Sequence, residues 1–234
     1  MLKQILLVTA FIGLVLGLNG QSLENPSFSF SHKKLSYLTL KDGTEVQGYI
    51  KDLDRKKGLI EEVKLESEKG KKTKYSPADI EFMYLPPSGF DKMNSALDVM
   101  YDAQKWADDS VDSDLLKDGY TYFENAMVQV KKKKMELLMQ VLNPGFSKDV
   151  KVYHDPLAKE SASLGVGGIS VAGGNAKSYY VSKGGATATL LTKKDYKKSE
   201  FDAMWKGCKA VTGKYSDVKW TELVQHIMAY SECK

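Results

Sequence analysis

Short stretches of alternating apolar and polar residues fill positions 35–86. Residues 37–40 alternate, a turn signal follows at Asp42-Gly43, and the alternation resumes over residues 46–50. Glycine-containing turns at 57–58 and 69–70 bound the next stretches, and a last apolar stretch covers 80–84. Alternation with a period of two between turn residues is typical of half-buried strands. Five such strands predict a small SH3-like or Sm-like barrel over residues 35–86.

After Pro86-Pro87 the apolar spacing becomes helical, so residues 87–118 are predicted to form a linker with a helix over about 93–106. Residues 120–192 return to strand-like patterns. Apolar residues then recur at i, i+3, i+4 and i+7 over 201–208 and at similar spacing over 220–227, which predicts two amphipathic helices. We therefore expect a second, mainly β unit with a C-terminal helix pair over residues 119–234. The predicted fold class is α+β, mainly antiparallel β.

The first twenty residues have the pattern of a leader. Lys3 precedes an apolar run over 5–18, which ends in the small residues Asn19 and Gly20. A basic start, a short apolar centre and a small-residue exit are typical of a secretory signal peptide, here 1–20. The run is short for a membrane span and no second one follows, so no transmembrane span is expected in the mature chain. Residues 21–34 are polar and Ser-rich, which predicts a flexible lead-in.

The composition indicates an apolar core and a surface like that of soluble proteins, and it adds little else to the prediction of function. The chain has 42% hydrophobic and 27% charged residues and a formal net charge of +4. This near balance gives no field that would favour nucleic acid as a partner. The lysine runs at 69–72 and 131–134 are interpreted as solvated turns or strand edges, with a polyanion-binding surface as the alternative.

Two cysteines, Cys208 and Cys233, are present. In an exported chain an even count favours a disulfide. The bond would close a loop of about 25 residues and stabilise the fold by roughly 3 kcal/mol through chain entropy. Free thiols or a metal pair are the alternatives, but two sulfurs without nearby histidines make a poor metal site.

No complete catalytic, cofactor or metal motif is found, so no catalytic residue, cofactor or metal is predicted. None of the three histidines has a partner at ligand spacing. His154, at the end of a predicted strand, is the best single candidate for a ligand contact, whereas His226 is expected to face solvent. A hydrolase with a site near His154 or in the loop between Gly165 and Gly174 is an alternative, but that loop lacks the strand–turn–helix context of a nucleophile elbow.

Tyrosines are frequent in the second half of the chain, and most suit half-buried strand positions. Tyr179 and Tyr180 are retained as possible ligand contacts, because aromatic residues outside the cell stack on sugars or line protein interfaces.

Several motifs resemble those of uncharacterised exported envelope proteins of Gram-negative bacteria that begin with a small β-barrel. They are residues 38–43, 48–50, 75–80, 152–155 and 179–181, and the helical tail near Tyr230 and Cys233. The resemblance implies an envelope protein of unknown role and supplies no catalytic residues. We therefore expect an exported, non-enzymatic binding or structural module that is periplasmic, outer-membrane-associated or extracellular. Its partner would be a protein or a surface polymer of the envelope.

Overall fold

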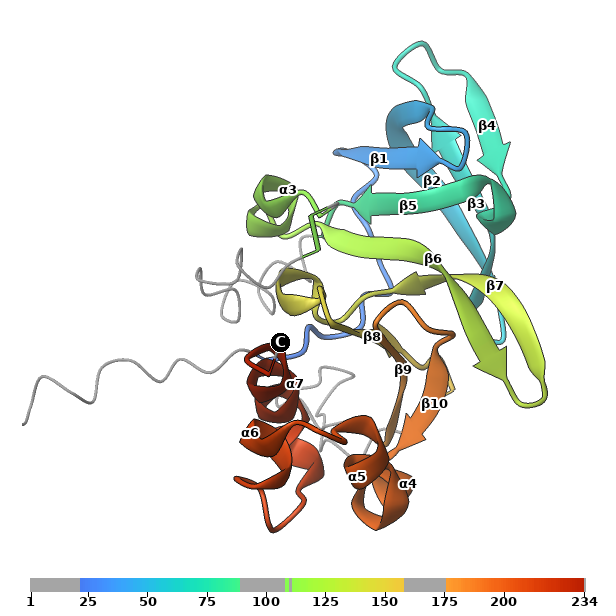
Figure 1. Cartoon of the computed structure of the whole chain (residues 1–234). Helices are drawn as coiled ribbons and strands as arrows, with labels where there is room; N and C mark the ends of the chain where they lie inside the picture. The colour runs from blue at the N-terminus through green and yellow to red at the C-terminus, as the bar shows by residue number, and fades with distance from the viewer. Residues whose placement is uncertain (1–21, 89–107, 110, 158–175, 234) are drawn as a thin grey trace, which may run out of the picture.

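The computed structural model describes residues 22–88, 108–109, 111–157 and 176–233. Two antiparallel sheets and a group of C-terminal helices make up the described chain (Figure 1). The predicted leader 1–20, the predicted helix over 93–106 and the glycine-rich loop lie outside the described residues. The fold class predicted from the sequence, α+β with mostly antiparallel sheets and a C-terminal helix pair, is confirmed.

The larger sheet has seven strands in the order β4-β3-β2-β1-β5-β6-β7. Its strands are β1 (Leu35–Leu40), β2 (Glu45–Lys56), β3 (Leu59–Glu66), β4 (Lys72–Tyr75), β5 (Ile80–Leu85), β6 (Thr121–Val130) and β7 (Lys133–Gln140). The turns fall where the glycines predict them, since Gly43 and Gly58 have φ values of 83° and 80°, a region that L side chains rarely adopt.

The five strands predicted at 35–86 all form, but a closed barrel is not confirmed. β5 pairs with β1 on one side and with β6 on the other, so the sheet continues past residue 86 into the second half of the chain. The sheet of described residues does not close on itself. Local alternation identifies strands, but it does not show which neighbour completes the sheet.

The start of β6 and the end of β7 are buried on both faces. Phe123 and Leu138 belong to the core cluster inside the larger sheet, together with Leu38, Ile50 and Met83. On the other face, Tyr122, Val128, Leu137 and Val141 pack against the smaller sheet. Its lysine run forms a solvent-exposed turn in which Lys131 has a φ of 55°.

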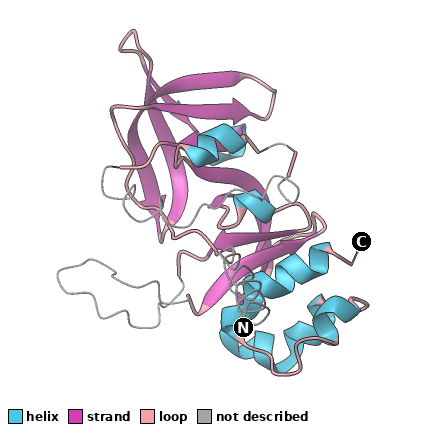
Figure 2. Cartoon of the chain, turned by 90° about the vertical axis from the view of Figure 1, so that its left-hand side faces the viewer, coloured by secondary structure: helices cyan, strands magenta, loops and turns pink. Residues whose placement is uncertain are grey.

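The smaller sheet has the order β10-β9-β8 and lies between the larger sheet and the helices (Figures 1 and 2). Its strands are β8 (Val150–His154), β9 (Ser178–Lys183) and β10 (Thr189–Thr192). Successive side chains of a strand point to opposite faces, so Tyr180 and Tyr153 face the larger sheet while Tyr179 and Val152 face the helices.

The C-terminal helices are short and are linked by turns. After β10 come α4 (Lys193–Asp195), the π-helical turn η5 (Tyr196–Glu200), α5 (Phe201–Met204), α6 (Lys209–Thr212), the 3-10 turn η6 (Trp220–Glu222) and α7 (Leu223–Ser231). Their apolar residues, among them Trp205, Trp220 and Ile227, form one core with β8 and β9. As predicted, the two amphipathic faces fill a core.

Three connecting segments complete the chain. The 3-10 turn η2 (Pro77–Asp79) precedes β5, and η4 (Pro144–Phe146) precedes β8. The helix α3 (Ser113–Lys117) starts at Asp112, whose Oδ1 accepts hydrogen bonds from the backbone N–H groups of Asp114 and Leu115. Asp112 is therefore the N-cap of α3.

The lead-in is packed along the sheets instead of standing free. Phe30 is buried against Phe123 with ring centroids 5.9 Å apart. The backbone N–H of Glu24 donates to the carbonyl of Leu142, and that of Ser27 donates to Gln140. The polar composition of 21–34 therefore does not prevent residues 22–34 from covering both sheets.

Candidate functional site

His154 lies at the end of β8, where the lead-in and the β2–β3 hairpin meet the smaller sheet. The Phe28 ring meets the His154 ring edge to face, with centroids 5.5 Å apart. The guanidinium carbon of Arg55 lies 5.7 Å from the centroid of the same Phe28 ring. We call Phe28, Arg55 and His154 the Arg55 cluster. Phe28 is 63% exposed, so most of its apolar ring faces solvent next to a charged group.

The electrostatics of the Arg55 cluster keep the imidazole neutral. Burial lowers the pKa of His154 to about 4, and the nearby Arg55 charge contributes in the same direction against a weaker opposing effect of Asp155. Burial also lowers the pKa of Arg55. The Nη2 atom of Arg55 is closed to solvent and has no hydrogen-bond partner among the described residues. The cluster thus presents one positive charge beside a neutral ring and an exposed aromatic face.

The cluster is held in place by a tight contact between the two sheets. Gly58, in the β2–β3 turn, lies against Pro156, and a Cβ atom at position 58 would come within 2.5 Å of the Pro156 Cβ. Asp155 is buried and accepts hydrogen bonds from Ser178 Oγ (2.6 Å) and from the backbone N–H of Leu157 (3.0 Å). These contacts fix the end of β8 relative to Arg55.

A second polar group, centred on Glu124 of β6, joins the sheets. Tyr153 OH donates to Glu124 Oε1 at 2.6 Å, and Lys151 Nζ donates to Oε2 at 2.8 Å. Lys151 also pairs with Asp108 at 3.1 Å. Burial lowers the pKa of Lys151, but the two carboxylates outweigh it and the net pKa lies above its ordinary value. Lys151 is therefore a fixed ammonium group that clamps the sheets and is unsuited to act as a base.

Sequence patterns do not select Glu124 as a site residue, although one signal of its role is present. Glu124 shares the face of β6 that carries Tyr122, Ala126 and Val128, so it is a carboxylate at a core-facing position. Such a group must be paired to be buried, and its partner Lys151 is another charged residue within an alternating strand.

His226 is buried among the C-terminal helices, so the prediction that it faces solvent is wrong. Its Nδ1 lies 2.7 Å from the Tyr196 hydroxyl, which accepts a hydrogen bond from Trp205 Nε1 at 2.9 Å. An indole N–H only donates, so the Tyr196 oxygen accepts from Trp205. The donor in the hydrogen bond between Tyr196 and His226 is set by the tautomer of the imidazole. Nε2 has no hydrogen-bond partner among the described residues, and Glu222 Oε2 is 4.0 Å away.

The two tyrosines predicted as ligand contacts lie next to each other on β9, where Tyr179 pairs with His154 and Tyr180 with Tyr153. Tyr179 and Tyr180 are each only 7% exposed and point to opposite faces of β9. Tyr179 stacks on Trp220 with ring centroids 5.3 Å apart. Both rings fill cores, as tyrosine commonly does in sheets, and their role as ligand contacts stays a prediction.

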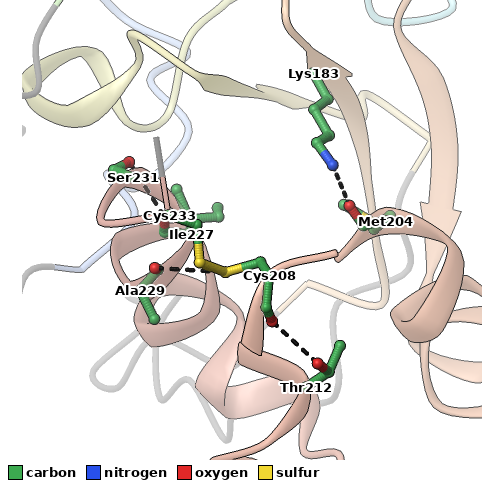
Figure 3. The surroundings of a disulfide bond; sticks show 8 residues. All are labelled: Lys183, Met204, Cys208, Thr212, Ile227, Ala229, Ser231 and Cys233. Carbon is green, nitrogen blue, oxygen red and sulfur yellow. Dashed lines mark hydrogen bonds between the residues drawn. A yellow bond between two sulfur atoms is a disulfide. The ribbon is translucent and has the colours of Figure 1, made fainter. Parts of the chain in front are cut away.

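The predicted disulfide between Cys208 and Cys233 is confirmed (Figure 3). The Cα atoms are 5.6 Å apart, and the bond ties the start of α6 to the turn after α7. Nearby, Lys183 Nζ donates to the Met204 carbonyl and lies 4.1 Å from the Tyr230 ring centroid. Lys183 thus connects the end of β9 to α7 close to the disulfide.

Within the described ranges, no group of three or more His, Cys, Asp or Glu residues is placed to hold a metal ion. No helix in the part of the chain that the structure describes is both long and apolar enough to cross a membrane. No protein-family model matches the chain, and no curated protein or solved structure is detectably similar to it.

Proposed function

We propose that this chain is an exported, non-enzymatic binding module of a bacterial cell envelope, which holds a protein partner at the Arg55 cluster. The observation that carries the binding role is the exposed Phe28 ring beside a half-buried Arg55. Exposed aromatic and arginine side chains in contact are enriched at interaction surfaces. Export is supported by the leader pattern of residues 1–20 and by the disulfide, since such bonds persist in oxidising compartments.

The test is quantitative capture of an envelope protein by the exported, tagged chain after chemical cross-linking. Phe28→Ala removes the exposed ring, whereas Met127→Ala removes an exposed side chain (41%) on β6 outside the cluster. We expect one stoichiometric partner with the native chain and with Met127→Ala, and a loss of about tenfold or more with Phe28→Ala.

Equal recovery with both variants would reject the Arg55 cluster as the binding surface. Co-sedimentation with isolated envelope polysaccharide in place of a protein would assign the partner to surface polymers. Repeated turnover of a substrate by the purified chain would favour the hydrolase alternative. A steep fall of binding with salt would favour polyanion binding through the lysine runs.

A further inference from the structure

The guanidinium group of Arg55 carries a charge that no described residue neutralises. Among the described residues, Nη2 has no hydrogen-bond partner and is closed to solvent, and burial lowers the pKa of this side chain without an opposing influence from any of them. A nearby carboxylate would oppose that influence. Asp155, the acid closest along the chain to His154, already accepts hydrogen bonds from Ser178 and Leu157. A buried charge without a counter-charge is costly, so folded proteins normally pair such groups.

The groups around Arg55 determine which kind of ligand would fit beside its guanidinium group. The exposed Phe28 ring lies against Arg55 and also against the His154 imidazole, which is neutral near pH 7. The adjacent Lys56 pairs with Glu61 at 3.5 Å and is solvent-exposed. The site therefore offers one planar cation and an aromatic face, with no second cation engaged in it from the part of the chain that the structure describes.

We propose that Arg55 binds a carboxylate of an acidic peptide segment of the partner, with an apolar group of that segment resting on Phe28. This inference rests on the proposed function and names the chemistry of the ligand. A guanidinium group binds a carboxylate through parallel N–H···O bonds, and its delocalised charge is neutralised by an anion at the accessible edge of the side chain. A single positive charge matches a carboxylate monoanion, whereas a phosphate dianion would retain net charge in a partly buried place.

The proposal is tested on the purified full-length mature chain with benzoate as the probe, benzamide as its uncharged isostere, and inorganic phosphate as the competing anion. Binding is followed by NMR shifts of the backbone amides of β2 and β8 at constant ionic strength. We expect saturable shifts with benzoate, at least fivefold weaker binding of benzamide and of phosphate, and loss of benzoate binding in Arg55→Met. Lys57→Met is the matched control for net charge, and it should retain benzoate binding.

Stability gives an independent readout. Without any carboxylate present, Arg55→Met should be at least as thermally stable as the native chain, because it removes an uncompensated charge at similar volume. Arg55→Lys keeps the charge but loses the planar group, so it should fold and bind benzoate several-fold more weakly. Three results would each overturn the proposal: a Tm of Arg55→Met lower by about 4 °C or more, equal binding of benzoate and benzamide, or preferred binding of phosphate. Failure of benzoate binding with retained Phe28-dependent capture would leave the proposed function standing.

Discussion

Acidification should destabilise this protein through His226, and the size of the effect follows from the helical core. Burial lowers the pKa of His226 to about 4 from 6.5, with Glu222 opposing only weakly. The folded state therefore binds its proton less readily than the unfolded state does. The stabilisation is fully present above pH 6.5 and is lost as the pH falls towards about 4. At about 1.4 kcal/mol per unit, the total is about 3 kcal/mol, of which about 2 kcal/mol is already lost at pH 5.

The perturbation that isolates this effect is His226→Asn. The Asn side-chain amide, which can donate or accept, replaces Nδ1 as the partner of the Tyr196 hydroxyl, but it does not titrate. The titratable groups that face the ring are Tyr196, Tyr215 and Glu222, and all three remain in the variant. His154, whose pKa is also lowered, contributes equally to both proteins and cancels in the difference.

The assay is urea unfolding of both proteins from pH 7.5 to pH 5. We expect the native chain to lose about 2 kcal/mol more than His226→Asn over this range. NMR titration of the His226 ring should show no protonation down to about pH 5. Parallel stability curves for the two proteins, or a ring that titrates near 6.5, would refute the assignment of His226 as a neutral buried group.

Two further substitutions test the contacts between the sheets. Gly58→Ala and Gly70→Ala both force alanine into a left-handed conformation, with φ of 80° and 77°, at about 1 kcal/mol each. Only position 58 also overlaps Pro156, so Gly58→Ala should unfold at clearly lower urea, and equal midpoints would show that this turn does not press on β8. Glu124→Gln leaves Lys151 with one of its two carboxylates and should cost about 2 kcal/mol. Adding Lys151→Met should restore part of that loss in a double-mutant cycle, and strict additivity would argue against the clamp.

Local features of the fold were predictable because local chemistry decides them. The strand and turn positions in 35–86 follow from alternation and from glycines, and the disulfide follows from an even cysteine count. The predicted closed barrel is not confirmed, because β5 pairs with β6. A long connection separates these two strands, and local sequence patterns do not show that strands so far apart will pair. His226 was misplaced because α7 is covered by Phe201 and Tyr215 from preceding elements, which makes its buried face wider than the apolar stripe indicates.

In the candidate site, too, features set by local sequence are predictable and features set by distant segments are not. His154 could be selected from its place at a strand end, and the structure does put it in a polar cluster. Its neighbours Phe28 and Arg55 come from segments far away in sequence, so no spacing rule links them. Tyr179 and Tyr180 were selected for residue type alone, and type does not distinguish a tyrosine that fills a core from one that is available to a ligand.

The β6–β7 hairpin makes the folding of the two sheets interdependent. Since Phe123 serves one core and Tyr122 the other, a fragment that ends before residue 121 would expose the interior of the first sheet. A fragment that begins at residue 121 would expose the apolar face of the hairpin that the first sheet normally covers. Proteolytic nicking, domain exchange or gene fusion between the halves would thus yield aggregation-prone fragments instead of two independently folded domains.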